Sequence, residues 1–397
     1  MAEIGFELAR GSGPQAAPLP GFARTPARTA RLSLAEAEAI RGEWADLAAR
    51  SLEANNFFHP DFALPAAARL ADGVEVATVR DGDGRLIAAA PVARARLGRL
   101  APSLRFWSHN YGPLGVPLLD QGRADSAVAA LLAENPAALV LPDMTVEGPA
   151  TAAFLRAARR AGRHAAIIGV HRRAALDRKA ATGLRAALPT RRRKEYARQM
   201  RRLGDSGALV FESTAEPAKV RARFEEFLVL EAAGWKGGGG TALASSEKTR
   251  SFARQAIRDR AAANAVRIDS LRLDRRPIAM VVSFVEGDAA WTWKIAYDEK
   301  FARFSPGAQV MLDLPGPLFA ETAVARIDSL AAPDHPMIDH LWPGRLAIGT
   351  VVIAPCGNAA FHHFGLALAR AEIRARGMVR GLRDRLKGRA RNKETET

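Results

Sequence analysis

The chain has 397 residues, of which 48% are hydrophobic and 25% are charged, and its formal net charge at pH 7 is +16. This composition is ordinary for a globular protein with room for two domains, and it excludes fibrous and wholly disordered classes. The only cysteine, Cys356, excludes an intrachain disulfide.

Both ends of the chain are predicted to lie outside the folded domains. Residues 1–30 are rich in Gly, Pro and Ala without periodicity, which predicts a disordered arm. Residues 366–397 form a predicted basic tail, in which Val379, Leu382 and Leu386 fall at helical spacing opposite arginines. The first residues lack a basic segment followed by an apolar stretch, so we expect a cytoplasmic protein.

The first half alternates predicted strands and helices. A helix is predicted over 34–52, and the turn Asp81-Gly-Asp-Gly84 separates strands at 74–80 and 85–95. A passage rich in Pro, Gly and aromatic residues follows at 106–115. The remaining predictions are a helix at 124–133, a strand at 138–141, a helix at 149–161 and a strand at 164–170.

The second half has the order β-β-β-α-β. Strands are predicted at 266–273, 277–285 and 289–298, joined by polar turns, and a helix at 305–320 leads to a strand at 324–330. Both halves place a polar turn before an Ile-Ala strand. We therefore predict tandem domains over 31–170 and 191–365, joined by a linker over 171–190.

The start of the helix at 305 is a candidate phosphate site. Ser305 is predicted to cap the helix and Pro306 to occupy its first position. Gly307 has no side chain to cover the free backbone N–H groups at the helix start, and Arg303 precedes them in the sequence. The competing interpretation is an ordinary capped helix that follows a strand.

A carboxylate on an apolar helix face is the candidate general base. In the predicted helix over 217–233, Glu231 shares one face with Val220, Phe224, Phe227 and Leu228. Burial of a carboxylate raises its pKa toward neutrality, as a general base requires. The alternative is a structural ion pair with Lys236 or an arginine.

Two further segments carry candidate residues. Trp235 and Lys236 precede four glycines, which favours a flexible lid hinged at the glycines, against the alternative of a long surface turn. The second segment contains Asp334, His335, Asp339 and His340. A metal site is disfavoured because His335 and His340 are five residues apart.

Several segments together resemble a known family. They are Leu230-Glu-Ala-Ala-Gly-Trp-Lys-Gly237, Gly240-Thr-Ala242, Trp293-Lys-Ile-Ala-Tyr-Asp298, Ala302-Arg-Phe-Ser-Pro-Gly307 and Asp334-His-Pro-Met-Ile-Asp-His-Leu-Trp342. The chain is similar to the CelD-like acetyltransferases of the GNAT superfamily, which are distantly similar to the FemAB transferases. The resemblance covers about residues 44–353. Between Arg303 and Gly307 the chain has one residue more than the usual phosphate loop of that superfamily.

The resemblance implies a fold and a reaction. The expected fold is of the α/β class, α+β type, with two GNAT-like domains built on mixed, mostly antiparallel sheets. The expected reaction is direct attack of an amine or hydroxyl on the thioester of acetyl-CoA or another acyl-CoA, which acts as a co-substrate, with no tightly bound cofactor.

The resemblance also implies roles for residues of this chain. The base is sought among Glu231, Asp328, Asp334 and His335. Acceptor contacts are expected from Trp235, Lys236, Trp293 and Asp298. The donor is expected to contact the end of one strand and the start of the next helix, at Ile295, Ala296, Arg303, Ser305, Gly307, Ala308 and Gln309.

The partners remain open at the level of sequence. A small molecule or a glycan precursor is the expected acceptor. A FemAB-like enzyme would instead use an aminoacyl-tRNA donor, with the basic segment over 191–202 on RNA phosphates. The basic tail would suit an anionic membrane surface, and a scaffold without catalysis is a third alternative. The charge alone is no firm nucleic-acid signature.

Overall fold

The computed structural model describes residues 27–356, except 100, 239 and 241, together with residues 363 and 365–371. Most of the predicted arm and tail therefore lie outside the described residues. Within the predicted arm, Arg28–Leu32 instead form strand β1, which is held by pairing with β2. Residues 365–371 of the chain's end are helical.

The first half consists of strands with helices on both faces. Its elements are β1, α1 (Leu34–Ala39), α2 (Arg41–Ala49), η1 (Asn56–Phe58), α3 (Pro60–Leu70), β2 (Val74–Arg80), β3 (Leu86–Leu97), β4 (Ala101–Phe106), β5 (Leu118–Leu119), α4 (Ala124–Ala133), β6 (Ala138–Thr145), α5 (Pro149–Arg160) and β7 (Ala165–Asp177).

The second half follows a short helical connection. Its elements are α6 (Arg178–Ala181), α7 (Leu184–Ala187), α8 (Thr190–Gly204), β8 (Leu209–Thr214), α9 (Pro217–Ala233), α10 (Trp235–Gly238), η2 (Leu243–Ser245), α11 (Glu247–Ala262), β9 (Val266–Leu273), β10 (Arg276–Glu286), β11 (Ala289–Tyr297), η3 (Glu299–Phe304), α12 (Pro306–Asp313), α13 (Pro315–Glu321), β12 (Arg326–Asp328), η4 (Ile338–His340) and β13 (Gly344–Ile353).

The two halves repeat one strand pattern. Each begins with four antiparallel strands, β1–β4 and β8–β11. Each then adds one parallel strand, so that β6 pairs with β4 and β12 pairs with β11 over only three residues. This repeat confirms the predicted mixed, mostly antiparallel α/β architecture with two similar halves.

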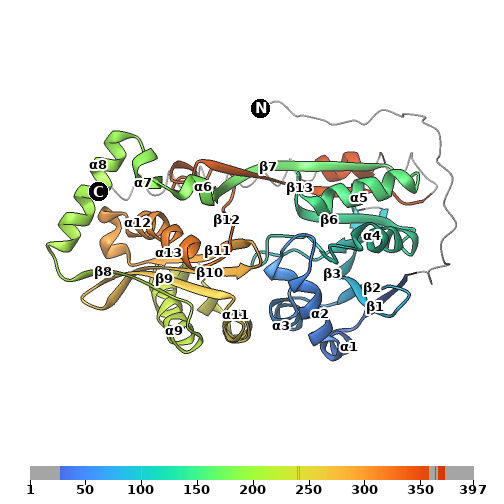
Figure 1. The fold of residues 1–397 in the computed structure, drawn as a ribbon, viewed down its shortest axis with the longest axis horizontal. Helices are drawn as coiled ribbons and strands as arrows, with labels where there is room; N and C mark the ends of the chain where they lie inside the picture. Colours follow the sequence, from blue (N-terminus) through green and yellow to red (C-terminus); the bar gives the residue numbers. More distant parts are fainter. Residues whose placement is uncertain are drawn as a thin grey trace.

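The last strands of the two halves are exchanged. β13, from the second half, pairs with β6 of the first, while β7, from the first half, pairs with β12 of the second. β7 and β13 also pair with each other, and Figure 1 shows them running together across both halves. The main path of the sheet is β1-β2-β3-β4-β6-β13-β7-β12-β11-β10-β9-β8, and β5 pairs with β3 beside it.

Three expectations need correction. The predicted linker over 171–190 is not a separate connection at its start, because residues 171–177 continue β7 and pair with β12 and β13. The predicted helix over 305–320 is two helices, since Pro315 begins α13 after a break at Leu314. The exchange also unites the two expected sheets into one continuous sheet.

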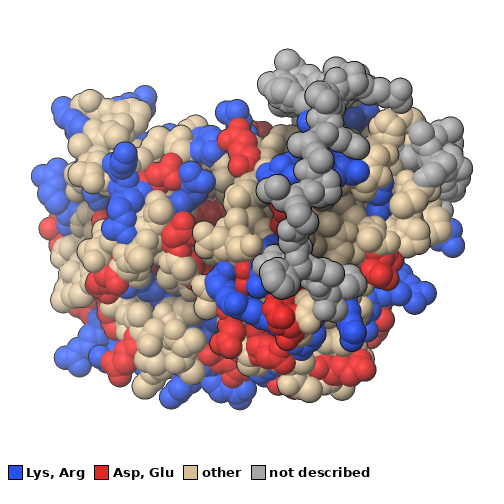
Figure 2. Space-filling model, turned by 45° about the vertical axis from the view of Figure 1, so that its right-hand side comes forward, with Lys and Arg blue, Asp and Glu red and all other residues tan. Residues whose placement is uncertain are grey.

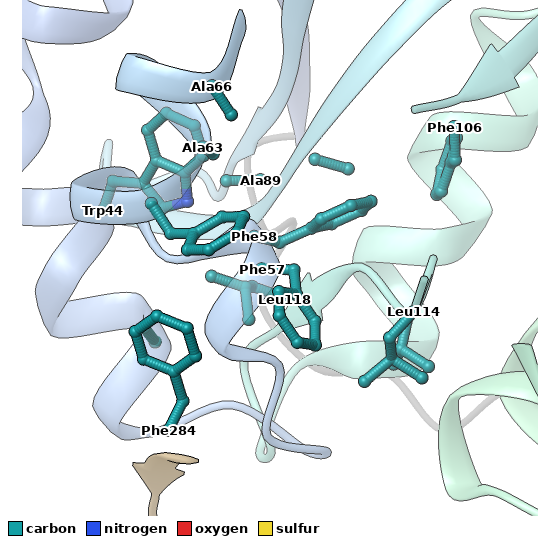
Figure 3. Close-up of a cluster of buried hydrophobic side chains, with 14 of the residues drawn as sticks. Trp44, Phe57, Phe58, Ala63, Ala66, Ala89, Phe106, Leu114, Leu118 and Phe284 are labelled. Carbon is teal, nitrogen blue, oxygen red and sulfur yellow. The ribbon is translucent and has the colours of Figure 1, made fainter. Parts of the chain in front are cut away.

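The largest apolar core spans both halves. Phe57 of the first half packs edge-on against Phe284 and Trp291 of the second, with ring centroids 6.3 and 5.8 Å apart. Figure 3 shows this cluster, with Phe57, Phe58 and Phe284 close together. A second core lies on the other face of β9–β11, beneath α12 and α13.

A buried ion pair and a buried hydrogen bond join the same halves. Arg173 on β7 contacts Asp328 on β12 at 2.5 Å, and both side chains are buried. Arg260 on α11 is also buried, and it donates to Asn56 of the first half at 2.8 Å. The halves therefore share a core, a sheet and buried polar contacts.

Candidate active site

The expected donor strand and helix lie against each other. β11 and β12 pair only from Ala289↔Arg326 to Trp291↔Asp328, after which no pairing joins them within the described residues. In the chain, α12 follows β11 after the short helix η3. A Cβ on Gly307 would lie 3.5 Å from Ile295 Cδ1 and 3.6 Å from Tyr297 Cδ1, so the start of the helix rests on the end of the strand.

A β-bulge redirects strand β11 at this place. Val282 pairs with Lys294 and Ser283 with Thr292, which leaves Trp293 as the extra residue. A bulge bends its strand and changes where the neighbouring side chains point. Ile295 and Ala296 follow the bulge directly, so the strand segment expected to hold a carbonyl group begins with this irregularity.

The start of α12 differs from the prediction in one respect. Ser305 adopts a left-handed conformation, with φ 52° and ψ 46°, and its side chain makes no capping hydrogen bond. This conformation links η3 to α12. Pro306 occupies the first helical position as predicted.

The other expected donor residues have structural partners. Ala308 and Gln309 are buried, and the Gln309 side chain donates to the Tyr196 carbonyl at 3.2 Å and accepts from Arg185 at 3.1 Å. The Arg303 guanidinium lies over the Phe304 ring, 4.7 Å from its centroid, on an exposed residue. Arg303 is therefore the expected donor residue that solvent reaches most readily.

Glu231 lies at the end of α9, where its side chain is buried. Its Oε2 accepts a hydrogen bond from the Leu243 N–H at 2.8 Å. The predicted apolar face is confirmed, because Val220, Phe224, Phe227 and Leu228 are buried with it. The next residues approach β11, since a Cβ on Gly234 would lie 3.7 Å from the Tyr297 carbonyl oxygen.

The other candidate bases are placed differently. Asp328 is buried in the ion pair with Arg173, and its second oxygen accepts from the Leu330 N–H at 2.9 Å. Asp334 is exposed, with φ 57°. His335 Nδ1 accepts from the Met337 N–H at 3.3 Å, and Met337 Sδ would lie 3.8 Å from a Cβ on Gly307. The His335 segment thus lies beside the start of α12.

The residues expected to contact the acceptor have different surroundings. Trp293 is buried, and its indole N–H donates to the Tyr111 carbonyl at 2.7 Å. Asp298 accepts from the Lys300 N–H at 3.1 Å and pairs with Arg276 at 3.1 Å. Trp235 and Lys236 belong to α10, and their side chains lie outside the described part of the chain.

The sequence prediction missed a group that the first half contributes. The Lys294 ammonium lies 4.7 Å from the centroid of the Tyr111 ring. Burial raises the pKa of Tyr111, and the charge of Glu231 raises it further. Burial and the charge of Lys294 lower the pKa of His109 to about 4. The aromatic residues over 106–115 were visible in the sequence. Nothing in that segment indicates that Tyr111 contacts Lys294.

This site combines a buried carboxylate, a lysine, a tyrosine and a bulged strand that ends at a helix start. Among the described residues, no group of three or more His, Cys, Asp or Glu is arranged to hold a metal ion. The arrangement offers proton transfer near Glu231 and backbone donors along β11. These polar groups are of the kinds used in acid–base catalysis.

A known family matches part of the second half. Residues 190–335 match the family described as "Acetyltransferase (GNAT) domain". This segment begins at α8 and contains α9, the bulged strand, α12 and β12. The chain has the fold of GNAT acyltransferases.

Solved structures similar to this one extend over both halves. The C-terminal domain of a putative lysylphosphatidylglycerol synthetase from Agrobacterium fabrum has a TM-score of 0.52 and 14% identity, covering 86% of this chain and 97% of that one. FemX has a TM-score of 0.52 and 12% identity, covering 82% and 96%. A protein of unknown function from Bacteroides thetaiotaomicron has a TM-score of 0.50 and 11% identity, covering 82% and 99%.

These likenesses show a common fold and no more, because all three identities are low. No curated protein matches the chain. No helix in the described part of the chain combines the length and apolar character needed to cross a bilayer.

Proposed function

We propose that the protein is a CelD-like acyltransferase that moves an acetyl or longer acyl group from coenzyme A to an amine or hydroxyl of a small molecule or glycan precursor. The acceptor attacks the thioester carbonyl carbon directly and forms a tetrahedral intermediate; its collapse breaks the carbon–sulfur bond and releases coenzyme A as a thiolate, which takes up a proton. Glu231 takes the proton that the acceptor loses. No covalent enzyme intermediate is needed.

The separation of β11 from β12 is the observation that carries this proposal. β11 and β12 pair over three residues, and the Thr292 hydroxyl donates to the Ser329 carbonyl at 3.2 Å just beyond them. Past this point no strand pairing joins the two segments within the described residues, and the proposal places an extended ligand there. Backbone N–H groups around Ile295 and Ala296 would hold the thioester oxygen, and the start of α12, with Arg303 beside it, would receive the pyrophosphate. Met337 and Tyr297 lie over Gly307, so donor binding requires these side chains to move.

The first half offers less room at the corresponding place. β4 and β6 also part after three pairs, but Gly115 fills that position with its backbone. Its N–H donates to the Asp143 carbonyl at 3.1 Å, and a Cβ on it would lie 2.0 Å from the Pro142 oxygen. We therefore assign the donor to the second half, and assign to the first half the role of completing the site with Tyr111.

An aminoacyl-tRNA donor is the alternative, and helix α8 favours it. Arg191, Lys194, Arg201 and Arg202 are exposed on α8, and none forms an ion pair with a carboxylate of the described residues. α8 contacts the donor helix through the Tyr196 carbonyl and Gln309. Figure 2 shows Lys and Arg atoms gathered on the raised end of the molecule where Figure 1 places α8.

Calorimetric titration of the full chain with acetyl-CoA, free CoA and an aminoacyl-tRNA tests the donor. The proposal expects CoA compounds to bind with an affinity that changes little with salt. An RNA donor would instead lose affinity steeply as salt rises, because cation–phosphate contacts release counterions. A folded protein that binds RNA and no CoA compound would overturn the acyl-CoA proposal. Binding of neither would favour a scaffold.

A further inference from the structure

A groove lies on the flank of α9 that faces away from Glu231. Its volume is about 880 Å³. α9 forms one wall, and Figure 1 places this helix below the strands that form the opposite side. The β9–β10 turn and the beginning of η3 complete the groove, with Arg275, Pro277 and Lys300 among its lining residues.

The groove combines an apolar wall with charged groups. Val229 lies in the wall and is 71% exposed, which is unusual for a large apolar side chain beside a concave surface. Leu230, Ala233 and Pro277 extend the apolar surface. A ligand that fits here therefore needs an apolar part.

The carboxylates of the groove are already engaged with other residues. Glu225 pairs with Arg254 at 2.6 Å, and Glu226 pairs with Arg272 at 2.8 Å. Asp298 pairs with Arg276. Glu299 also has a partner. The negative groups of the lining are thus already matched by cations.

Two exposed cations of the lining, Arg275 and Lys300, are not held in such ion pairs within the described residues. Arg275 comes from the β9–β10 turn and Lys300 from η3, so separate elements supply the two charges. Such a pair is suited to an anion with several acceptor oxygens.

The backbone at Arg275 gives an independent sign of function. Leu273 pairs with Arg276, so Asp274 and Arg275 form a two-residue hairpin turn, and both have positive φ, at 48° and 67°. Glycine is favoured in such a position because it has no Cβ. Asp274 helps to fix the turn, since its side chain accepts from the Ala208 N–H at 2.8 Å. Arg275 therefore holds a backbone conformation that is strained for a residue with a side chain, which makes the turn a candidate functional position.

We propose that this groove binds a phosphate monoester that carries an apolar group, with Arg275 and Lys300 on the phosphate and Val229 and Pro277 against the apolar part. Two sources have this chemistry, the 3′-phosphate end of coenzyme A and a phosphorylated acceptor. The proposal that the groove binds such a phosphate does not depend on the proposed function. Only the choice between these two sources rests on it.

The test uses octyl phosphate as the probe, with the full chain in calorimetric titrations. Octyl glucoside carries the same apolar chain without the charge, and inorganic phosphate carries the charge without the chain. We expect octyl phosphate to bind the native protein more tightly than either control compound. The double variant Arg275→Gly with Lys300→Gln is expected to bind it roughly tenfold or more weakly, because two charge-assisted contacts are lost.

The variant is also designed to remain folded. Glycine suits the conformation of residue 275, so the melting temperature of Arg275→Gly is expected to stay level or rise. Arg221→Gln, an exposed change on α9 outside this groove, is the matched control and is expected to bind octyl phosphate normally. Equal binding by the native chain and the double variant would overturn the proposal, as would equal binding of octyl glucoside or no binding of octyl phosphate.

Coenzyme A and 3′-dephospho-coenzyme A then distinguish the sources. Loss of coenzyme A affinity in the double variant, with dephospho-coenzyme A unaffected, assigns the groove to the donor. Unchanged affinity for both, with octyl phosphate binding still lost, assigns it to the acceptor, and either pattern upholds the groove. Octyl phosphate contains no thioester, so failure of the acyl-CoA proposal leaves this test intact.

Discussion

Glu231 is the residue on which the proposed chemistry depends most directly. Its carboxylate is buried, accepts one backbone hydrogen bond and lies close enough to Tyr111 to influence its pKa. Glu231→Gln keeps the size of the side chain and an oxygen for the Leu243 N–H, but removes the base. We predict that kcat falls by about a hundredfold or more in single-turnover assays.

The same variant is expected to keep its donor affinity and a melting temperature within a few degrees of the native value. A purely structural Glu231 predicts the opposite pattern, with a clearly lower melting temperature and nearly normal turnover. Measuring melting and turnover on one preparation decides between them.

Asp269 gives the protein a pH-dependent stability. It is fully buried on β9, and burial raises its pKa to about 7, although Ser213 donates to it and Arg267 lies 3.7 Å away. In the unfolded chain an aspartate titrates near 4. The folded state therefore favours the protonated form, and that stabilisation is complete below about pH 4 and lost as the pH rises through about 7.

We predict that the free energy of unfolding falls between about pH 4 and 7, by up to about 1.4 kcal/mol per pH unit, because of this one group. Asp269→Asn should reduce that slope, as measured by urea unfolding at several pH values. An unchanged slope in the variant would show that other groups cause the dependence.

At the level of elements, the buried ion pair between Arg173 and Asp328 joins β7 to β12. Its removal tests whether Asp328 has a structural or a catalytic role. Asp328→Leu leaves Arg173 buried without its partner, which is expected to cost about 3–5 kcal/mol in urea unfolding. The double change Arg173→Met with Asp328→Leu removes both charges and should recover most of that loss. If the single change instead left stability unaltered and abolished turnover, Asp328 would belong to the chemistry.

The sequence predicts elements well where the local signals are complete. β9, β10 and β11 are bounded by polar turns and were predicted within one residue at most ends. The division between α12 and α13 was also readable, since Pro315 and Pro317 lie inside the expected helix. The predicted strand that corresponds to β7 ends too early. His171, Arg172 and Arg173 have no strand pattern in the sequence, and they extend β7 by pairing with β13.

The same reasoning explains the candidate site. The periodicity of α9 was sufficient to place Glu231 on a buried face. The approach of Tyr111 to Lys294 depends on how the two halves pack, and no local pattern encodes that contact. The charge pair of Asp328 was hidden for the same reason, because Arg173 lies in the other half of the chain.

For the molecule as a whole, the shared core and continuous sheet predict a single cooperative unfolding event. Phe57, Phe284 and Trp291 belong to one cluster although they come from different halves. Scanning calorimetry should give one transition, with equal calorimetric and van't Hoff enthalpies. Two resolved transitions would mean that the halves are independently stable and that the exchanged strands contribute little.

The exchanged strands also impose an order on biosynthesis. Val351, Val352 and Ile353 of β13 lie next to β6, but a growing chain presents β6 long before the ribosome has made them. Until then the newly made first half carries an open strand edge in the middle of its future sheet, and such edges are templates for misassembly. Pairing between segments so distant in sequence is intrinsically slow. The first half therefore completes its strand pairing only after β13 has been made, and until then the unpaired edge of β6 is open to misassembly.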